Sequence, residues 1–292
     1  MQQLRIHPDG PSFSRMIAGA WRWNSVSSET IERLIQTSLE NGIDTFDHAD
    51  IYGDYSNEAL FGEVLKRNPS LVQKMKLISK CGIKLFSGKK ADHRVKHYDT
   101  SKQHIIQSAE HSLKLLGVDH LDLLLIHRPD PLMNAAEVAE AFGALKQQGK
   151  VLHFGVSNFT PSQFDLLQSY LSFPLVTNQI EISLFNHQSL FDGSLDHLYK
   201  LKTSAMAWSP LGGGKSMESE VVQKLQSLQQ KYNASESQLL YAWLLKHPSL
   251  IFPVMGTTKP ERIVEGIKSM VINLDRQDWF EMLKMATGKE VA

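Results

Sequence analysis

Eight short apolar runs recur along the chain, and amphipathic segments separate them. The runs cover residues 15–21, 42–46, 75–79, 121–126, 151–156, 175–180, 204–208 and 250–255. Several of them, such as LDLLLI, are apolar without alternation, which is typical of strands buried on both faces of a parallel sheet. Strands that alternate with helices predict repeated βαβ units.

The segments between the runs carry the start and stop signals of helices. One amphipathic stripe ends at Asn41-Gly42, a pair that commonly stops a helix. Thr160 and Gln163 stand three positions apart, with Pro161 at the first helical position, and Ser235 and Gln238 have the same spacing. Both pairs predict capping boxes. Further helices are expected within residues 56–66, 100–117, 134–149, 187–201 and 219–233.

Eight such units in 292 residues favour a closed (β/α)8 TIM barrel in one domain spanning 1–292. A doubly wound sheet is the alternative, but GAWRWN after the first run does not match G-x-G-x-x-G. Two additions are expected. Residues 3–14 predict a hairpin that turns at Pro8-Asp9-Gly10 and plugs the bottom of the barrel, and an extra helix begins at Asp275.

The charge balance argues against several classes of partner. Basic and acidic residues both number 31, so no positive excess points to nucleic acid or to an anionic membrane. A single cysteine, Cys81, rules out an intramolecular disulfide and fits a reducing compartment. We find no signal-peptide core and no run of about 20 apolar residues. The expectation is a soluble cytoplasmic protein that acts on a small molecule.

Ionisable residues follow three neighbouring runs, at the strand ends where a barrel of this kind carries its chemistry. Asp47 and Tyr52 follow the second run, Lys80 the third and His127 the fourth. An ammonium lowers the pKa of a neighbouring tyrosine, ordinarily about 10, and an aspartate keeps that ammonium charged. A histidine can orient a substrate oxygen. Such a set can move a proton to or from a carbonyl oxygen.

Each of these residues has an ordinary structural explanation when it is taken alone, such as a core histidine or a surface lysine. Four of them at three adjacent strand ends favour the catalytic interpretation. Nearby, His48 and Asp50 are interpreted as scaffold residues, and Arg128 and Asp130 as residues that fix their loop. Cys81 is interpreted as packed in the core. Trp21 could line the substrate pocket or pack in the core. The 12 histidines are scattered, and no metal site is expected.

Six motifs taken together resemble a known family. DTFDHADIYG, LISKCG, LDLLLIHRPD, GVSNF, NQIEIS and AWSPLGGG are similar, in order and spacing, to the signatures of the aldo-keto reductase superfamily, in its bacterial-type oxidoreductase branch. The resemblance implies a (β/α)8 barrel that reduces aldehydes and ketones with NADPH and without a metal. It also implies that Tyr52 is the general acid, that Lys80 lowers its pKa, that Asp47 pairs with Lys80, and that His127 positions the carbonyl.

The same resemblance implies a set of cofactor contacts. Groups that hold the nicotinamide end match Ser157, Asn158, Gln179 and the stacking Trp208, and the pyrophosphate loop matches Ser209, Leu211 and Gly212. The adenosine end matches Thr257, Thr258, Lys259, Arg262 and Glu265. Two of these are cations, which suit a 2′-phosphate. NADPH is therefore expected over NADH.

The substrate is less constrained by the sequence. Segment 82–101 is long and basic, and the chain continues only about twenty residues beyond 271–274. We expect a monomer with an open pocket and broad, modest activity on small aldehydes, ketones or dicarbonyls. Two other classes stay open: a cofactor-binding subunit of an ion channel with vestigial chemistry, and a lyase or isomerase that uses Lys80 as a Schiff base.

Overall fold

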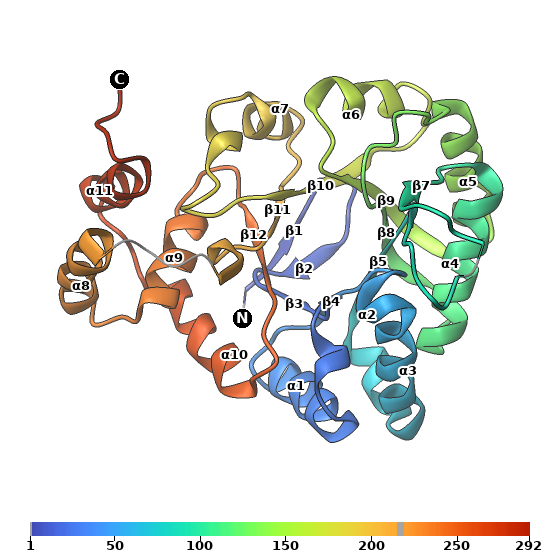
Figure 1. Cartoon of the computed structure of the whole chain (residues 1–292), viewed down its shortest axis with the longest axis horizontal. Helices are drawn as coiled ribbons and strands as arrows, with labels where there is room; N and C mark the ends of the chain where they lie inside the picture. Colours follow the sequence, from blue (N-terminus) through green and yellow to red (C-terminus); the bar gives the residue numbers. More distant parts are fainter. Residues whose placement is uncertain (1, 91, 215–218) are drawn as a thin grey trace.

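Eight parallel strands close into a barrel (Figure 1) in the order β10-β11-β12-β3-β4-β5-β8-β9. The computed structural model describes residues 2–90, 92–214 and 219–292. The barrel strands are β3 (Ile17–Gly19), β4 (Thr45–Asp47), β5 (Lys76–Cys81), β8 (Leu121–Ile126), β9 (Val151–Ser157), β10 (Leu175–Glu181), β11 (Met206–Trp208) and β12 (Phe252–Met255). Each apolar run supplies one strand, so the (β/α)8 prediction is confirmed.

Helices surround the barrel (Figure 1). They are α1 (Ser28–Glu40), α2 (Tyr52–Tyr55), α3 (Asn57–Arg67), α4 (Lys102–Leu116), α5 (Ala135–Gln147), α6 (Pro161–Gln168), α7 (Ser194–Lys200), α8 (Ser219–Tyr232), α9 (Glu236–Leu245), α10 (Pro260–Ile267) and α11 (Arg276–Thr287). The capping boxes expected at Thr160 and Ser235 are both present. Among the described residues, no helix is long and apolar enough to cross a bilayer.

The N-terminal hairpin closes one end of the barrel. Its strands β1 (Gln3–Arg5) and β2 (Ser12–Ser14) pair antiparallel, and the Gly10 N–H donates to the His7 carbonyl at 2.9 Å. Ile6 and Phe13 are fully buried in the cluster that fills the barrel interior. Because apolar side chains on the hairpin cap that interior core, the predicted plug is confirmed.

The extra C-terminal helix is confirmed as well. Asp275 caps α11 by accepting the Gln277 N–H. Trp279 of α11 stacks on Trp243 of α9, with ring centroids 4.8 Å apart. Each indole N–H donates to the other residue's carbonyl, so both polar edges are satisfied where the two rings pack.

Alternation along β4 and β5 sends neighbouring residues to opposite faces. Asp47 and Lys80 point into the barrel, where they pair with each other. His48 and Ser79 point outward to α3, where His48 meets the Phe61 ring at 4.4 Å and Ser79 donates to a glutamate. This alternation fixes which polar groups reach the mouth of the barrel.

Two elements were not predicted from the sequence. One is the single turn α2, which carries Tyr52. The other is a small antiparallel hairpin of β6 (Ile83–Lys84) and β7 (His97–Tyr98) within the basic segment 82–101, of which residue 91 lies outside the described range. Neither has enough apolar periodicity to stand out from a loop.

Candidate active site

Lys80 is the centre of the site. Its side chain is fully buried, and its ammonium donates to Asp47 Oδ2 at 2.7 Å, to the Tyr52 hydroxyl at 2.9 Å and to the His48 carbonyl at 2.7 Å. All three ammonium protons therefore have acceptors. Strand ends from β4 and β5 and the turn α2 bring the three predicted side chains together.

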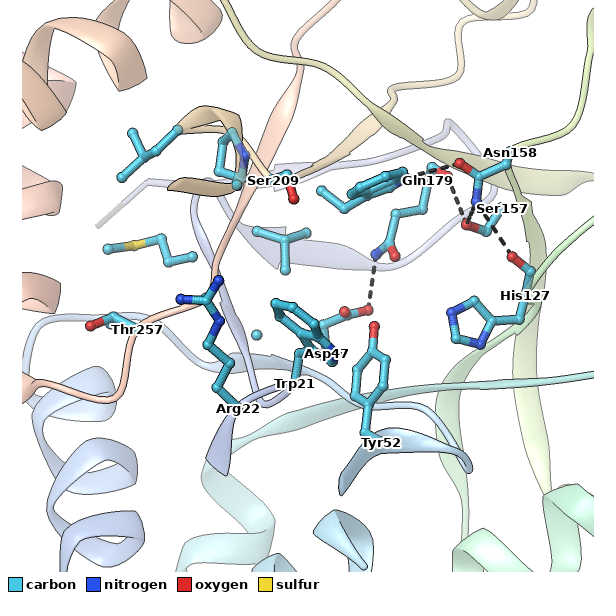
Figure 2. Close-up of a pocket in the computed structure, with 18 of the residues that line it drawn as sticks. Trp21, Arg22, Asp47, Tyr52, His127, Ser157, Asn158, Gln179, Ser209 and Thr257 are labelled. Atoms are coloured by element: carbon cyan, nitrogen blue, oxygen red, sulfur yellow. Dashed lines mark hydrogen bonds between the residues drawn. The ribbon is translucent and has the colours of Figure 1, made fainter. Parts of the chain in front are cut away.

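A strained turn presents Tyr52 to the lysine. Gly53 follows it at φ 61°, and a Cβ there would lie 2.0 Å from Asn57 Oδ1. Asp54 and Tyr55 also have positive φ. Left-handed backbone in consecutive residues is costly and is found mostly at functional sites. The tight turn folds the phenol back over the barrel mouth (Figure 2).

Amide side chains extend the network beyond the ion pair (Figure 2). Gln179 donates from Nε2 to Asp47 Oδ1 at 2.9 Å. The Ser157 hydroxyl donates to the Gln179 carbonyl at 2.8 Å. Asn158 donates to Ser157 Oγ at 2.7 Å and accepts from the Trp208 indole at 2.9 Å. Four residues expected at the nicotinamide end thus lie in one hydrogen-bonded chain that ends on Asp47.

Burial and pairing act in opposite directions on the Lys80 ammonium. Burial lowers the pKa of Lys80, but the charge and hydrogen bonds of Asp47 and Tyr52 outweigh it, and that pKa is raised. Lys80 is therefore held as a cation at neutral pH.

Lys80 acts to lower the pKa of Tyr52, as expected, but its effect is smaller than that of burial. Burial is the largest influence and raises the pKa of Tyr52, whereas the charge and hydrogen bond of Lys80 lower it; the net direction is upward. The phenol stays protonated at neutral pH. It can donate a proton, and the ammonium stands ready to stabilise the phenolate that donation leaves.

His127 faces the same point from β8. Its ring lies edge-on to the Tyr52 ring, with centroids 5.8 Å apart. Burial, followed by the charges of Lys80, Arg128 and Lys96, lowers the pKa of His127 well below its ordinary value. The imidazole is therefore neutral and can donate one hydrogen bond to a substrate oxygen without a change of charge.

A cavity of about 1070 Å³ opens at this mouth (Figure 2). Twelve residues expected at the site line it: Asp47, Tyr52, His127, Ser157, Asn158, Gln179, Trp208, Ser209, Leu211, Thr257, Arg262 and Glu265. Lys80 lies directly behind Asp47 and Tyr52. Gly212, Thr258 and Lys259 are not part of the lining; Gly213 takes the place expected of Gly212.

The end of the cavity away from His127 is built from helix ends and a bent loop. Ser209 adopts φ 49° and Gly213 φ 66°, so their backbone turns sharply beside the opening. Glu265 accepts from the hydroxyls of Ser235 and Ser237 at 2.6 and 2.8 Å. These serines were identified only as the start of α9, and their second role depends on the packing of α10 against it.

Other residues near the site are now placed. Trp21 lines the cavity and is 54% exposed, which decides against core packing. Asp130 fixes its loop, as expected, by accepting from Thr100 Oγ1 at 2.8 Å. Arg128 differs from the expectation, because it lines the cavity with its guanidinium 5.4 Å from the Trp208 ring centroid. Cys81 is fully buried, as expected.

Several lining residues were not predicted because they lie in loops or in the small hairpin of β6 and β7: Arg22, Ile51, Lys96 and Tyr98. One histidine pair at H-x-x-x-H spacing was also not predicted. His93 and His97 have ring centroids 5.4 Å apart. Among the described residues, however, no three His, Cys, Asp or Glu side chains gather closely enough to hold a metal ion.

Comparison with known proteins decides the family. Residues 15–286 match the model of the Aldo/keto reductase family. The chain belongs to this family. Its bacterial relatives include oxidoreductase YdhF of Escherichia coli K12, which is 48% identical over 100% of this chain and 99% of the relative. They also include the 6-dehydroglucose reductase of Agrobacterium fabrum, which is 44% identical over the full length of both.

A solved structure supports the fold independently. The thermostable aldo-keto reductase Tm1743, crystallised with the inhibitor epalrestat, superposes with a TM-score of 0.85. The match covers 98% of this chain and 100% of the other at 23% identity. The barrel seen here is therefore the fold of that enzyme. The family match and the bacterial relatives, and not this structure, make the chain an oxidoreductase.

Proposed function

We propose that this aldo/keto reductase uses NADPH to reduce aldehydes, ketones or dicarbonyls, with Tyr52 as the general acid. One observation carries the proposal. The buried chain Asp47–Lys80–Tyr52 ends beside His127 at one end of a large cavity, and Arg262 lines the same cavity near Glu265. A proton donor and a phosphate-binding cation in one cavity suit a reduction by a phosphorylated cofactor.

The lining fits a nicotinamide dinucleotide. Trp208 offers an aromatic face for the nicotinamide ring, and Asn158 and Gln179 offer amides for its carboxamide. The backbone has positive φ at Ser209 and Gly213, and peptide N–H groups in such a turn can bind a pyrophosphate. Arg262 would bind a 2′-phosphate. A cavity of about 1070 Å³ exceeds the usual range for one small ligand and leaves room for both cofactor and substrate.

The residues divide the work of carbonyl reduction between them. NADPH held in this cavity would supply a hydride to the carbonyl carbon. Tyr52 Oη and the neutral His127 ring hold the carbonyl oxygen, and Tyr52 gives it a proton as negative charge develops. The Lys80 ammonium stabilises the resulting phenolate, and Asp47 keeps that ammonium in place and charged.

The Schiff-base alternative conflicts with the state of Lys80. A nucleophilic amine needs a free lone pair, which a depressed pKa provides. Here the pKa of Lys80 is raised, and its three protons are all donated to neighbours. Lys80 serves as a fixed cation.

Parallel fluorescence titrations with NADPH and NADH test the proposal, followed by turnover of methylglyoxal. We expect NADPH to bind at least about tenfold more tightly, the size of one charge-assisted contact, and Arg262→Gln to remove that preference. Binding without turnover of any carbonyl would instead support the vestigial channel-subunit role. No binding of either cofactor would overturn the proposal.

A further inference from the structure

Two cations stand at the substrate end of the cavity. Arg128 follows His127 on the loop after β8, and Lys96 precedes β7; both line the cavity. The charges of both act on His127 and lower its pKa, and the charge of Arg128 also acts on Tyr52. The two cations line the same cavity as Tyr52 and His127, and their charges reach these groups.

Neither cation is neutralised by a residue that the structure describes. Among the described residues, neither side chain has an ion pair or a hydrogen bond. Of the four acidic groups of the lining, Asp47 pairs with Lys80, Asp54 lies 3.7 Å from Lys89, and Glu236 stands in the first turn of α9 beside Ser235 and Ser237. Glu265 is held by two serines. Two positive charges that lack an anionic partner and lie near a neutral imidazole favour the binding of an anion.

The orientation of Arg128 suits a carboxylate. Its guanidinium carbon lies 5.4 Å from the Trp208 ring centroid, a cation–π arrangement that leaves N–H groups free to donate. Ile51, Ile83, Leu85 and Tyr98 supply carbon surface beside the two cations. An arginine fork binds carboxylates through paired charge-assisted hydrogen bonds.

We propose that Arg128 and Lys96 form an anion subsite, and that the preferred substrates are aldehydes or ketones that also carry a carboxylate. This inference rests on the proposed carbonyl reductase function. The carbonyl lies between Tyr52 and His127, the apolar walls hold the carbon skeleton, and the carboxylate meets the two cations. Uncharged carbonyl compounds of the same size bind without that interaction.

Matched pairs of substrates test the subsite in the NADPH-loaded enzyme. Glyoxylate, succinic semialdehyde and 4-carboxybenzaldehyde place the carboxylate at three distances from the carbonyl, and each is compared with its primary amide. For at least one pair we expect kcat/KM to favour the acid by about tenfold or more, mainly through KM, as one charge-assisted contact predicts. The preference should shrink with added salt.

Variants assign that preference to the two residues. Arg128→Gln and Lys96→Gln should each lower the acid-to-amide ratio of kcat/KM several-fold, mainly by raising KM for the acids. Arg94→Gln is the matched control, because Arg94 is an exposed cation of the same loop that does not line the cavity. Ratios near one in the wild type, or equal losses for acid and amide in the variants, would overturn the subsite.

A binding arm separates failure of the subsite from failure of the proposed function. Calorimetry compares benzoate with benzamide on the wild type and both variants, with and without NADP⁺. Benzoate that binds more tightly than benzamide, and loses this advantage in Arg128→Gln, would support the subsite even if no carbonyl is reduced. Equal weak binding of both compounds would contradict it even in an active reductase.

Discussion

Two buried polar clusters lie along the strands β4 and β5. Opposite charges are paired in one of them and not in the other. The inner cluster, Asp47–Lys80–Tyr52, pairs opposite charges inside the barrel mouth. The outer cluster, defined here as His48, Asp50 and Glu58, lies between these strands and the helices α3 and α4. Residues one position apart in the sequence enter different clusters because strand side chains alternate.

The inner cluster has an acceptor or donor for each charged atom. Lys80 donates three hydrogen bonds, and Asp47 accepts from Lys80 on one oxygen and from Gln179 on the other. The opposite charge of Asp47 raises the pKa of Lys80 against the effect of burial, so Lys80 stays a cation. The cluster therefore retains its charges in a place where a reaction can use them.

The outer cluster has buried atoms without partners. Both ring nitrogens of His48, one carboxylate oxygen of Asp50 and one of Glu58 make no hydrogen bond within the described residues. Burial lowers the pKa of His48 to about 3, and burial with the nearby Glu58 raises the pKa of Asp50 to about 7. A buried ionisable group that has no partner of opposite charge is more stable in its neutral form. Both clusters are buried. The pairing of opposite charges, which only the inner cluster has, is what lets a buried cluster keep its charges.

The largest expected effect follows from removing the inner cation. Lys80→Met should lower kcat by roughly 10²–10⁴-fold, the usual contribution of acid catalysis. It should also destabilise the fold by about 3–5 kcal/mol, because Asp47 is left buried and unpaired. Steady-state kinetics and urea unfolding measure the two losses.

A double variant separates those two losses. Lys80→Met with Asp47→Asn should recover much of the stability and none of the activity. Ser79→Ala, the outward neighbour of Lys80, is the control and should leave kcat within a few-fold. Recovery of activity in the double variant would show that the charge of Lys80 is not needed.

In the outer cluster, removing a charge should stabilise. The pKa of Asp50 is raised to about 7, so the folded state holds a proton that the unfolded chain releases near pH 4. Stability from this group is complete below pH 4 and is lost as the pH rises to 7. Asp50→Asn should therefore add about 4 kcal/mol at pH 8, measured by urea unfolding, and add little at pH 4. An equal gain at both pH values would contradict the shifted pKa.

Replacing His48 should change the free energy of unfolding less than replacing Asp50, and with the opposite pH dependence. Its pKa is lowered to about 3, so the unfolded chain takes up a proton first, and stability falls as the pH drops below about 6.5. His48→Phe keeps a ring beside Phe61 and removes the titration. Between pH 7.5 and 5.5 the variant should lose about 1.4 kcal/mol less than the wild type. Parallel unfolding curves at the two pH values decide this.

The sequence predicts the inner cluster better than the outer one. Apolar runs locate the strands, and Asp47, Lys80 and His127 stand directly at their ends, so the barrel rule alone brings them together. The turn that orients Tyr52 depends on Gly53, which lies close against Asn57. No hydrophobic periodicity in the sequence predicts this turn. The outer cluster depends on how α3 packs against β5, and Arg128 reaches the cavity through a loop. Such contacts are set by tertiary packing.

The role of Tyr52 is tested most directly by Tyr52→Phe, which removes one hydroxyl and keeps the ring. Single-turnover reduction of a carbonyl by the NADPH-loaded variant is compared with the wild type, and NADPH affinity is measured alongside. We expect unchanged affinity and a rate lowered by roughly 10²–10⁴-fold. A rate within about tenfold of the wild type, with the fold intact, would contradict the assignment of Tyr52 as the proton donor.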